Sequence, residues 1–182
     1  MKAKLRKIHR LIKMFIIRKR YRLKNVDKTF YMAGNSSISS DLVAGEFSYI
    51  GPRAKIYPKV KIGAYTMLAN DVSIIGGDHA FNKVGLPIIF SGRGVLEETN
   101  IGKDVWIGAY SKILTGVTIG DGVIVGMGSV VTKDLEEYSV YAGVPAKKIK
   151  DRFKSQKEIG EHKEMLSKSA KIAGFNLEML CS

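Results

Sequence analysis

The chain holds three histidines, and only one of them has a sequence context suited to catalysis. His9 lies in a strongly basic segment and His162 in a charged C-terminal segment, whereas His79 follows Gly76-Gly77-Asp78 at the end of an aliphatic stretch. The ordinary pKa of an imidazole is close to neutral pH, so a neutral histidine can remove the proton of an attacking hydroxyl. His79 is therefore the candidate general base, and a lone structural histidine is the alternative.

Other side chains that support nucleophilic or metal chemistry are sparse. The single cysteine, Cys181, is next to the C-terminus, which excludes an intramolecular disulfide and a cysteine-built metal site. One unpaired thiol also fits a reducing cytoplasm. Serine, histidine and acidic residues show no triad arrangement. The residue types therefore favour neither a metal site nor a covalent enzyme intermediate.

The net charge of +13 is concentrated at one end of an otherwise ordinary globular composition. Residues 1–24 hold eleven of the 30 Lys and Arg and no acid, so the rest carries 19 basic against 17 acidic residues. Leu5, Ile8, Ile12 and Phe15 recur there at helical spacing and predict a basic amphipathic helix. Two roles stay open for it: contact with an anionic membrane surface, or a cap on the edge of the fold. No nucleic-acid partner is expected.

The basic segment does not predict a membrane crossing. Its longest apolar run covers residues 14–17. This is far below the roughly 20 residues of a spanning helix and below the ~7 to 15 of a signal-peptide core. We expect a cytoplasmic protein, with peripheral contact at the inner membrane surface as one of the two open roles of residues 1–24.

A repeat of six residues runs through the middle of the chain. Its first positions are aliphatic or small and fall in two unbroken phases: Val26, Met32, Ile38, Ala44, Ile50, Ile56, Ile62, Leu68 and Ile74, then Ile101, Ile107, Ile113, Ile119, Val125 and Val131. Position 5 is also small or aliphatic, and Gly or Ala often follows position 1. A helix would need a period near 3.6 and a simple amphipathic strand a period of two. The chain must therefore turn a corner every six residues.

That period fits a prism of short parallel strands with three faces. Positions 1 and 5 are expected to point inward, small residues relieve the corners, and coils of eighteen residues stack at about 4.8 Å. The first phase gives nearly three coils and the second gives two. The predicted fold is all-β, with a β-helix over residues 25–145, the basic helix over 1–24, and a basic segment with a helical tail over 146–182.

The two phases do not connect, because Ile74 and Ile101 are 27 residues apart. About 21 residues around 80–100 must therefore leave the prism and return. This stretch contains Gly85, Pro87, Gly92 and Gly94 and loses the hexad pattern. Long loops in compact domains are usually functional or disordered, so we expect this one to form part of a site that includes His79.

Four motifs follow one another in the second half of the prism. They are Gly76-Gly77-Asp78-His79, the segment 101–109 (IGKDVWIGA), the segment 126–134 (GMGSVVTKD) and the segment 142–146 (AGVPA). Together with the hexads, over residues 26–150, they resemble the hexapeptide-repeat acyltransferases. The closest similarity is to the maltose and galactoside O-acetyltransferase branch and its polysaccharide-modifying relatives.

This resemblance implies a left-handed parallel β-helix, a homotrimer with active sites between neighbouring subunits, and acetyl-coenzyme A as donor. Asp71 stands where relatives place an Asn that meets the acceptor, with a solvated corner as the alternative. Trp106 follows an inward position and should point outward, as a wall of the acceptor groove or as part of the subunit interface.

The resemblance also assigns residues to the donor. Those near the pantetheine arm or the phosphates of acetyl-coenzyme A would be Ala109, Met127, Thr132, Lys133, Lys147 and Lys150. The basic run that contains Lys147 and Lys150 suits an anionic ligand, although a solvated basic face has the same composition.

The predicted function is acetyl-coenzyme A-dependent O-acetylation of a sugar or polysaccharide-precursor hydroxyl, by direct transfer with His79 as the general base. Serine O-acetylation and aminosugar N-acetylation are the alternatives, since donor and base could be the same. A non-catalytic scaffold at a membrane surface is a third reading. A zinc-dependent carbonic anhydrase of the γ type is excluded, because its metal needs three histidines and the prism has one.

Overall fold

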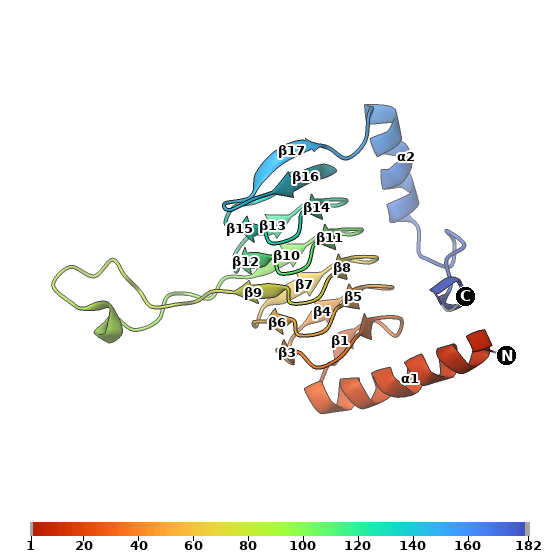
Figure 1. Ribbon diagram of the computed structural model, residues 1–182, viewed down its shortest axis with the longest axis horizontal. Helices are drawn as coiled ribbons and strands as arrows, with labels where there is room; N and C mark the ends of the chain where they lie inside the picture. Colours follow the sequence, from red (N-terminus) through yellow and green to blue (C-terminus); the bar gives the residue numbers. More distant parts are fainter. Residues whose placement is uncertain (1, 181–182) are drawn as a thin grey trace.

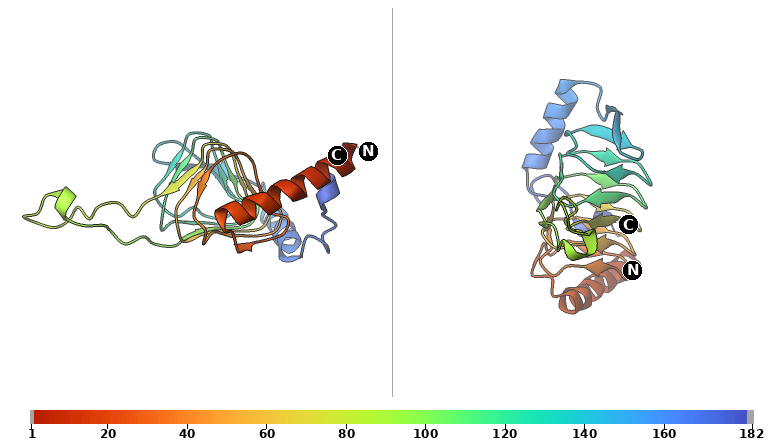
Figure 2. Two further views of the ribbon diagram at one scale, coloured as in Figure 1. Left: turned by 90° about the horizontal axis from the view of Figure 1, so that it is seen from below. Right: turned by 90° about the vertical axis from the view of Figure 1, so that its left-hand side faces the viewer.

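The computed structural model describes residues 2–180, with the side chains of residues 5–180, so Cys181 lies outside the described residues. Between a long N-terminal helix and a C-terminal segment, the chain winds as a stack of short strands (Figure 1). Viewed along the stack, the coil has a triangular outline (Figure 2). The predicted β-helix is confirmed.

Three parallel sheets form the faces of the prism. Sheet A contains β1 (Asn25–Val26), β4 (Val43–Ala44), β7 (Val60–Ile62), β10 (Thr99–Ile101) and β13 (Thr118–Ile119). Sheet B contains β2 (Tyr31–Met32), β5 (Tyr49–Ile50), β8 (Met67–Leu68), β11 (Trp106–Ile107), β14 (Ile124–Val125), β16 (Ser139–Ala142) and the antiparallel β17 (Lys147–Asp151). Sheet C contains β3 (Ser37–Ile38), β6 (Lys55–Ile56), β9 (Ser73–Ile75), β12 (Lys112–Leu114) and β15 (Val130–Val131).

The register between coils explains the period. β5 pairs with β8 so that Ile50 lies beside Leu68, eighteen residues later. Each hexad therefore supplies one face, and three hexads supply one coil. β10 pairs with β7 in the same way, Ile101 beside Ile62, although the chain has left the prism between them. The ladder continues across the excursion because the hexad phase resumes in register.

The interior is filled by the hexad positions that the sequence marks. Position 1 residues such as Ile50, Ile74 and Ile107 are fully buried, and position 5 residues such as Val72 and Ser111 are buried as well. The position after the first is small because coils approach closely: a Cβ on Gly63 would lie 2.5 Å from the carbonyl carbon of Gly102 in the next coil. Aliphatic burial along the whole axis stabilises the stack.

The two ends of the chain cover different parts of the prism. α1 (Lys2–Tyr21) lies across the open edge of the first coil, where Met14 and Ile17 are buried (Figures 1 and 2). α2 (Gln156–Ser167) is capped by Ser155, whose Oγ accepts from the N–H of Glu158. Neither described helix is long and apolar enough to cross a bilayer.

The C-terminal segment is held along the turns that join sheet A to sheet B. Asp104 in one such turn accepts from Arg152 Nη1 and pairs with His162 Nε2, both at 2.8 Å. Glu46 in another accepts from the N–H of Ala170 at 2.9 Å. The described chain then reaches α1 with η2 (Leu177–Leu180), so this segment runs back along the prism (Figure 1).

Candidate functional site

His79 lies at the root of an excursion that leaves the prism after β9 and returns at β10. The backbones of His79 and Arg93 form an isolated antiparallel β-bridge. The N–H of Ala80 donates to the carbonyl of Gly92 at 3.0 Å, and that of Gly94 to Asp78 at 2.6 Å. These bonds join the outgoing and returning limbs, so the backbone that carries the imidazole is fixed.

One ring nitrogen of His79 has no hydrogen-bond partner in the described residues. His79 is half-buried, and its Nδ1 is buried without a hydrogen-bond partner among the described residues. Buried polar atoms are almost always paired, because leaving one unpaired costs free energy. The nitrogen is therefore open to a partner from outside the described chain.

The exit from the prism requires a residue without a side chain. A Cβ on Gly76 would lie 2.0 Å from Oγ1 of Thr115 in the next coil. The return limb is tied down by Lys59, whose Nζ donates to the carbonyl of Leu96, and by the ion pair of Lys61 with Glu98 at 2.8 Å. The excursion thus has a rigid root, which places His79 reproducibly.

Residues 80–95 form an arm that extends away from the prism and includes η1 (Ile88–Phe90) (Figures 1 and 2). Its large apolar side chains are exposed over much of their surface: Phe81, Val84, Leu86, Ile88, Ile89, Phe90 and Val95. An exposed apolar segment of this kind is typical of a region that contacts another chain or a ligand.

Asp71 lies at a different edge of the prism, which we call the B–C corner, the turns that lead from sheet B to sheet C. Its carboxylate accepts two hydrogen bonds from Arg53, at 2.8 and 2.6 Å, and one from the amide of Asn70 at 2.8 Å. The hydrogen bond from Arg53 holds the pKa of the Asp71 carboxyl below its ordinary value. An acceptor at Asp71 would have to share this carboxylate with Arg53.

Sequence reasoning missed Arg53, although the repeat contains the signal. Arg53 and Asp71 are eighteen residues apart, one full coil, and occupy equivalent positions with φ of 60° each. Tyr110 has φ of 63° at the equivalent position of the next coil. Reading the sequence in coils of eighteen, with the 21 residues of the excursion left out, would have aligned these three side chains in one column.

Three more of the predicted residues lie at or beside the B–C corner. Ala109 and Met127 are in successive turns of this corner, where the carbonyl of Ala109 accepts from the N–H of Gly128 at 2.8 Å. Met127 is 75% exposed. Trp106 points outward from sheet B, as predicted, with 51% of its surface exposed, and lies in register with Met67 and Ile124.

The remaining predicted residues lie elsewhere. Thr132 and Lys133 follow β15 at the C–A corner, the edge of sheet C from which the His79 excursion leaves, and both are exposed. Lys147 and Lys150 are exposed on β17, where they pair with Ala142 and Val140 of β16. Between them, Lys148 pairs with Glu136 and Asp151.

The predicted site residues of one chain therefore form two separate groups. Asp71 precedes β9 and His79 follows it, so the strand of sheet C separates the two side chains. Asp71, Trp106, Ala109 and Met127 gather at one edge, while His79 and the 132–133 turn occupy the other. A single copy does not bring these groups together.

Two features of the described chain bear on other kinds of site. An apolar groove of about 600 Å³ lies between sheet B and the C-terminal segment, lined by residues such as Tyr65, Met67 and Phe175 and away from His79. Burial, with help from Glu46, raises the pKa of Tyr65 to about 12. Among residues 5–180, no three His, Cys, Asp or Glu side chains are grouped so that they could hold a metal ion.

Comparison with known proteins identifies the repeat. Residues 98–133 match the family described as bacterial transferase hexapeptide (six repeats). The chain is 50% identical over 68 residues to a chloramphenicol acetyltransferase of Morganella morganii, over 37% of this chain and 32% of that enzyme. Across four such curated relatives, the chain spans between 26% and 33% of their lengths.

Solved structures agree on the fold. A galactoside acetyltransferase in complex with coenzyme A shares 30% identity, with a TM-score of 0.56 over 68% of this chain and 66% of the other. A hexapeptide-repeat-containing acetyltransferase from Vibrio cholerae shares 16% identity, with a TM-score of 0.65 over 79% of this chain and 82% of the other. The β-helix matches the left-handed β-helix of hexapeptide-repeat acyltransferases.

Proposed function

We propose that this protein is an acetyl-coenzyme A-dependent O-acetyltransferase that uses His79 as its general base. The observation that carries the proposal is the position of His79, fixed at the root of the excursion with a buried nitrogen that nothing in the described chain satisfies. Similarity to acetyltransferases, one of them solved with coenzyme A, supports the donor.

The reaction would proceed by direct transfer. The acceptor oxygen attacks the thioester carbonyl carbon while the imidazole of His79 takes the hydroxyl proton. The tetrahedral intermediate then collapses, the carbon–sulfur bond breaks, and the thiolate of coenzyme A leaves with the proton that His79 returns. The atoms balance without a metal or a covalent enzyme intermediate.

A homotrimer would complete the site. In a threefold assembly, the C–A corner of one copy can face the B–C corner of the next, which brings His79 close to Asp71 and Trp106 of a neighbour. The exposed apolar arm supports this arrangement, because Phe81, Phe90 and neighbouring side chains have no cover within one chain. Packing the arm against an adjacent copy would bury that surface.

We also propose which residues contact acetyl-coenzyme A. Ala109, Met127, Thr132 and Lys133 line the two edges that a trimer would bring together, so they could border one pantetheine channel. Lys147 and Lys150 are exposed on β17 and would attract the phosphates of coenzyme A.

The acceptor is proposed to be a hydroxyl compound. Two acetyltransferases similar to this chain are named for a galactoside and for chloramphenicol as acceptors, and both acceptors carry hydroxyl groups. A sugar hydroxyl would supply the proton that His79 removes. Serine O-acetylation and aminosugar N-acetylation remain the alternatives. For its location we propose the cytoplasm, with the basic helix at the inner membrane surface.

The test measures release of free thiol from acetyl-coenzyme A with panels of galactosides, maltose, chloramphenicol, aminosugars and serine. We expect turnover with a sugar hydroxyl, and His79→Ala should lower it about 10²- to 10⁴-fold. His9→Ala, at a histidine outside the site, is the matched control and should leave the rate unchanged. Equal rates for His79→Ala and the intact protein would remove the assignment of the base. No turnover with any acceptor would favour a non-catalytic scaffold.

A further inference from the structure

α1 rests on the first coil through its polar and basic side. Arg10 lies 4.2 Å over the ring of Tyr31, and Lys13 donates to the hydroxyl of Tyr31 at 3.1 Å. Tyr21 donates to the carbonyl of Ser36 at 2.9 Å. Together with the buried Met14 and Ile17, these contacts attach one face of the helix to the first coil.

The opposite side of α1 is apolar and exposed. A helix turns about 100° per residue, which places a second stripe roughly opposite Met14 and Ile17. The large apolar side chains on it, between 45% and 69% exposed, are Leu5, Ile8, Leu11, Ile12, Phe15 and Ile16. No other described element lies beyond α1 at this end of the stack (Figure 1). We call this exposed apolar strip of α1 the outer stripe.

Basic side chains border the outer stripe along one edge. By helical position, His9, Lys13 and Arg20 lie along this edge, and all three line one groove. Lys19 falls within the stripe, and its ammonium lies 4.5 Å from the ring centroid of Phe15. An apolar strip with basic side chains within it and along its edge matches the boundary between anionic headgroups and acyl chains.

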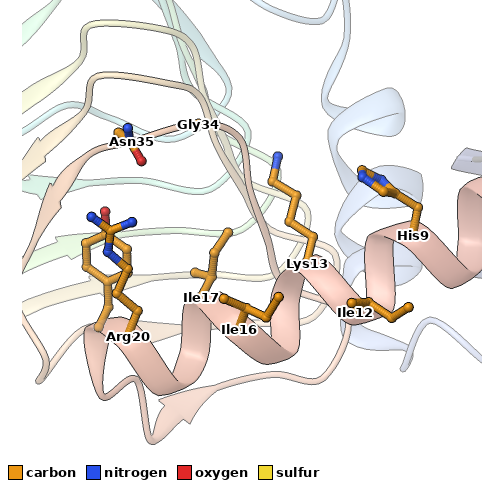
Figure 3. A pocket seen from close by; sticks show the side chains of 9 residues that line it. His9, Ile12, Lys13, Ile16, Ile17, Arg20, Gly34 and Asn35 are labelled. Atoms are coloured by element: carbon orange, nitrogen blue, oxygen red, sulfur yellow. The ribbon is translucent and has the colours of Figure 1, made fainter.

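One border of the outer stripe is hollowed into a groove of about 370 Å³. In Figure 3, Ile16 and Ile17 lie between Arg20 on one side and Lys13 and His9 on the other. Basic groups beside apolar side chains would suit a lipid, whose phosphate is joined to hydrocarbon chains.

We propose that the outer stripe of α1 binds the surface of an anionic lipid bilayer, with the helix lying in the plane of the interface. A second copy of this chain is a poorer occupant, because two such helices would bring two strongly cationic segments together. An anionic bilayer matches both the apolar strip and its charges. This inference does not depend on acetyl transfer, since α1 lies across the first coil, whereas His79 follows β9 of the third coil (Figure 1).

The experiment uses the full chain with sedimentation of vesicles made from phosphatidylcholine alone or mixed with phosphatidylglycerol. We expect binding to the mixed vesicles that weakens as salt is raised. Ile12→Asp should lower the fraction bound about tenfold or more, because an inserted aliphatic side chain is replaced by an anion. Ile172→Asp makes the same change at a 74% exposed isoleucine outside α1 and should bind like the intact chain.

A second pair tests charge. Arg20→Glu should weaken binding to the mixed vesicles, whereas Lys157→Glu, at an exposed lysine of α2, should not. Equal binding of Ile12→Asp and the intact chain would overturn the proposal, as would equal binding to both kinds of vesicle. Self-association in the absence of lipid that Ile12→Asp abolishes would assign the outer stripe to a second copy instead. Matching melting curves of all variants exclude misfolding as the cause.

Discussion

Two inactive variants of this chain should restore activity to each other when they assemble together. His79→Ala removes the proposed base at the C–A corner, and Asp71→Gly removes the carboxylate at the B–C corner. Glycine is the replacement at 71 because φ there is 60°, a conformation that glycine adopts without strain. The loss of the side chain is then separated from any distortion of the turn.

The expected magnitude follows from the geometry of a threefold ring. Each site takes one corner from each of two neighbouring chains, so it is intact only where both contributed corners are unmutated. A mixed trimer, with two copies of one variant and one of the other, has one intact site of three. We therefore expect about a third of the activity of the intact trimer. Each variant alone should be close to background if both side chains serve the reaction.

Co-expression of the variants with different affinity tags, followed by purification on both tags, yields mixed trimers for the thiol-release assay. Mixed trimers of His79→Ala with His79→Gln are the control and should show no recovery, because every site then lacks the imidazole. Mixed trimers of His79→Ala and Asp71→Gly that gain nothing over the single variants would refute the shared site. A chain that sediments as a monomer would refute it as well.

Three further outcomes are expected from single variants. Ile113→Ala should cost about 2–5 kcal/mol of the free energy of unfolding in urea, because Ile113 is fully buried, whereas Leu114→Ala, 43% exposed, should cost less than about 1 kcal/mol. Gly63→Ala should lower the melting temperature, since its Cβ would lie 2.5 Å from backbone of the next coil; an unchanged melting temperature would contradict the coil contact. Arg53→Gly should raise the pKa of the Asp71 carboxyl toward 3.8. A titration of this carboxyl by NMR measures the change. Because the folded pKa is depressed, the stability that this pair adds is present above pH 3.8 and is lost as the pH falls below it, so the two proteins should converge in acid.

The fold could be predicted because a β-helix is close to one-dimensional. Ile50, Ile74 and Ile107 each contact residues one coil away, so a fixed period determines their burial without knowledge of the rest of the chain. The excursion could be found for the same reason, since a break in phase between Ile74 and Ile101 requires chain to leave the prism.

The candidate site was less accessible to the sequence. The type of residue and its motif single out His79, but the unpaired Nδ1 depends on what the excursion places around it. The bond between Arg53 and Asp71 joins two coils, and the separation of Asp71 from His79 by β9 depends on which corner each occupies. Distance along the chain does not report such separations.

By itself the sequence determined the period, the identity of the inward residues and the amphipathic character of the first helix, because these properties depend on neighbours at fixed spacing. The tertiary structure decided which side of that helix is covered. Arg10 and Lys13 meet Tyr31 on the first coil, and the stripe with Ile12 and Phe15 is left outside. The physical reason is that the coil edge offers an aromatic ring and backbone carbonyls, which bind the cations and the hydroxyl on this side of the helix, while Met14 and Ile17 are buried beside them.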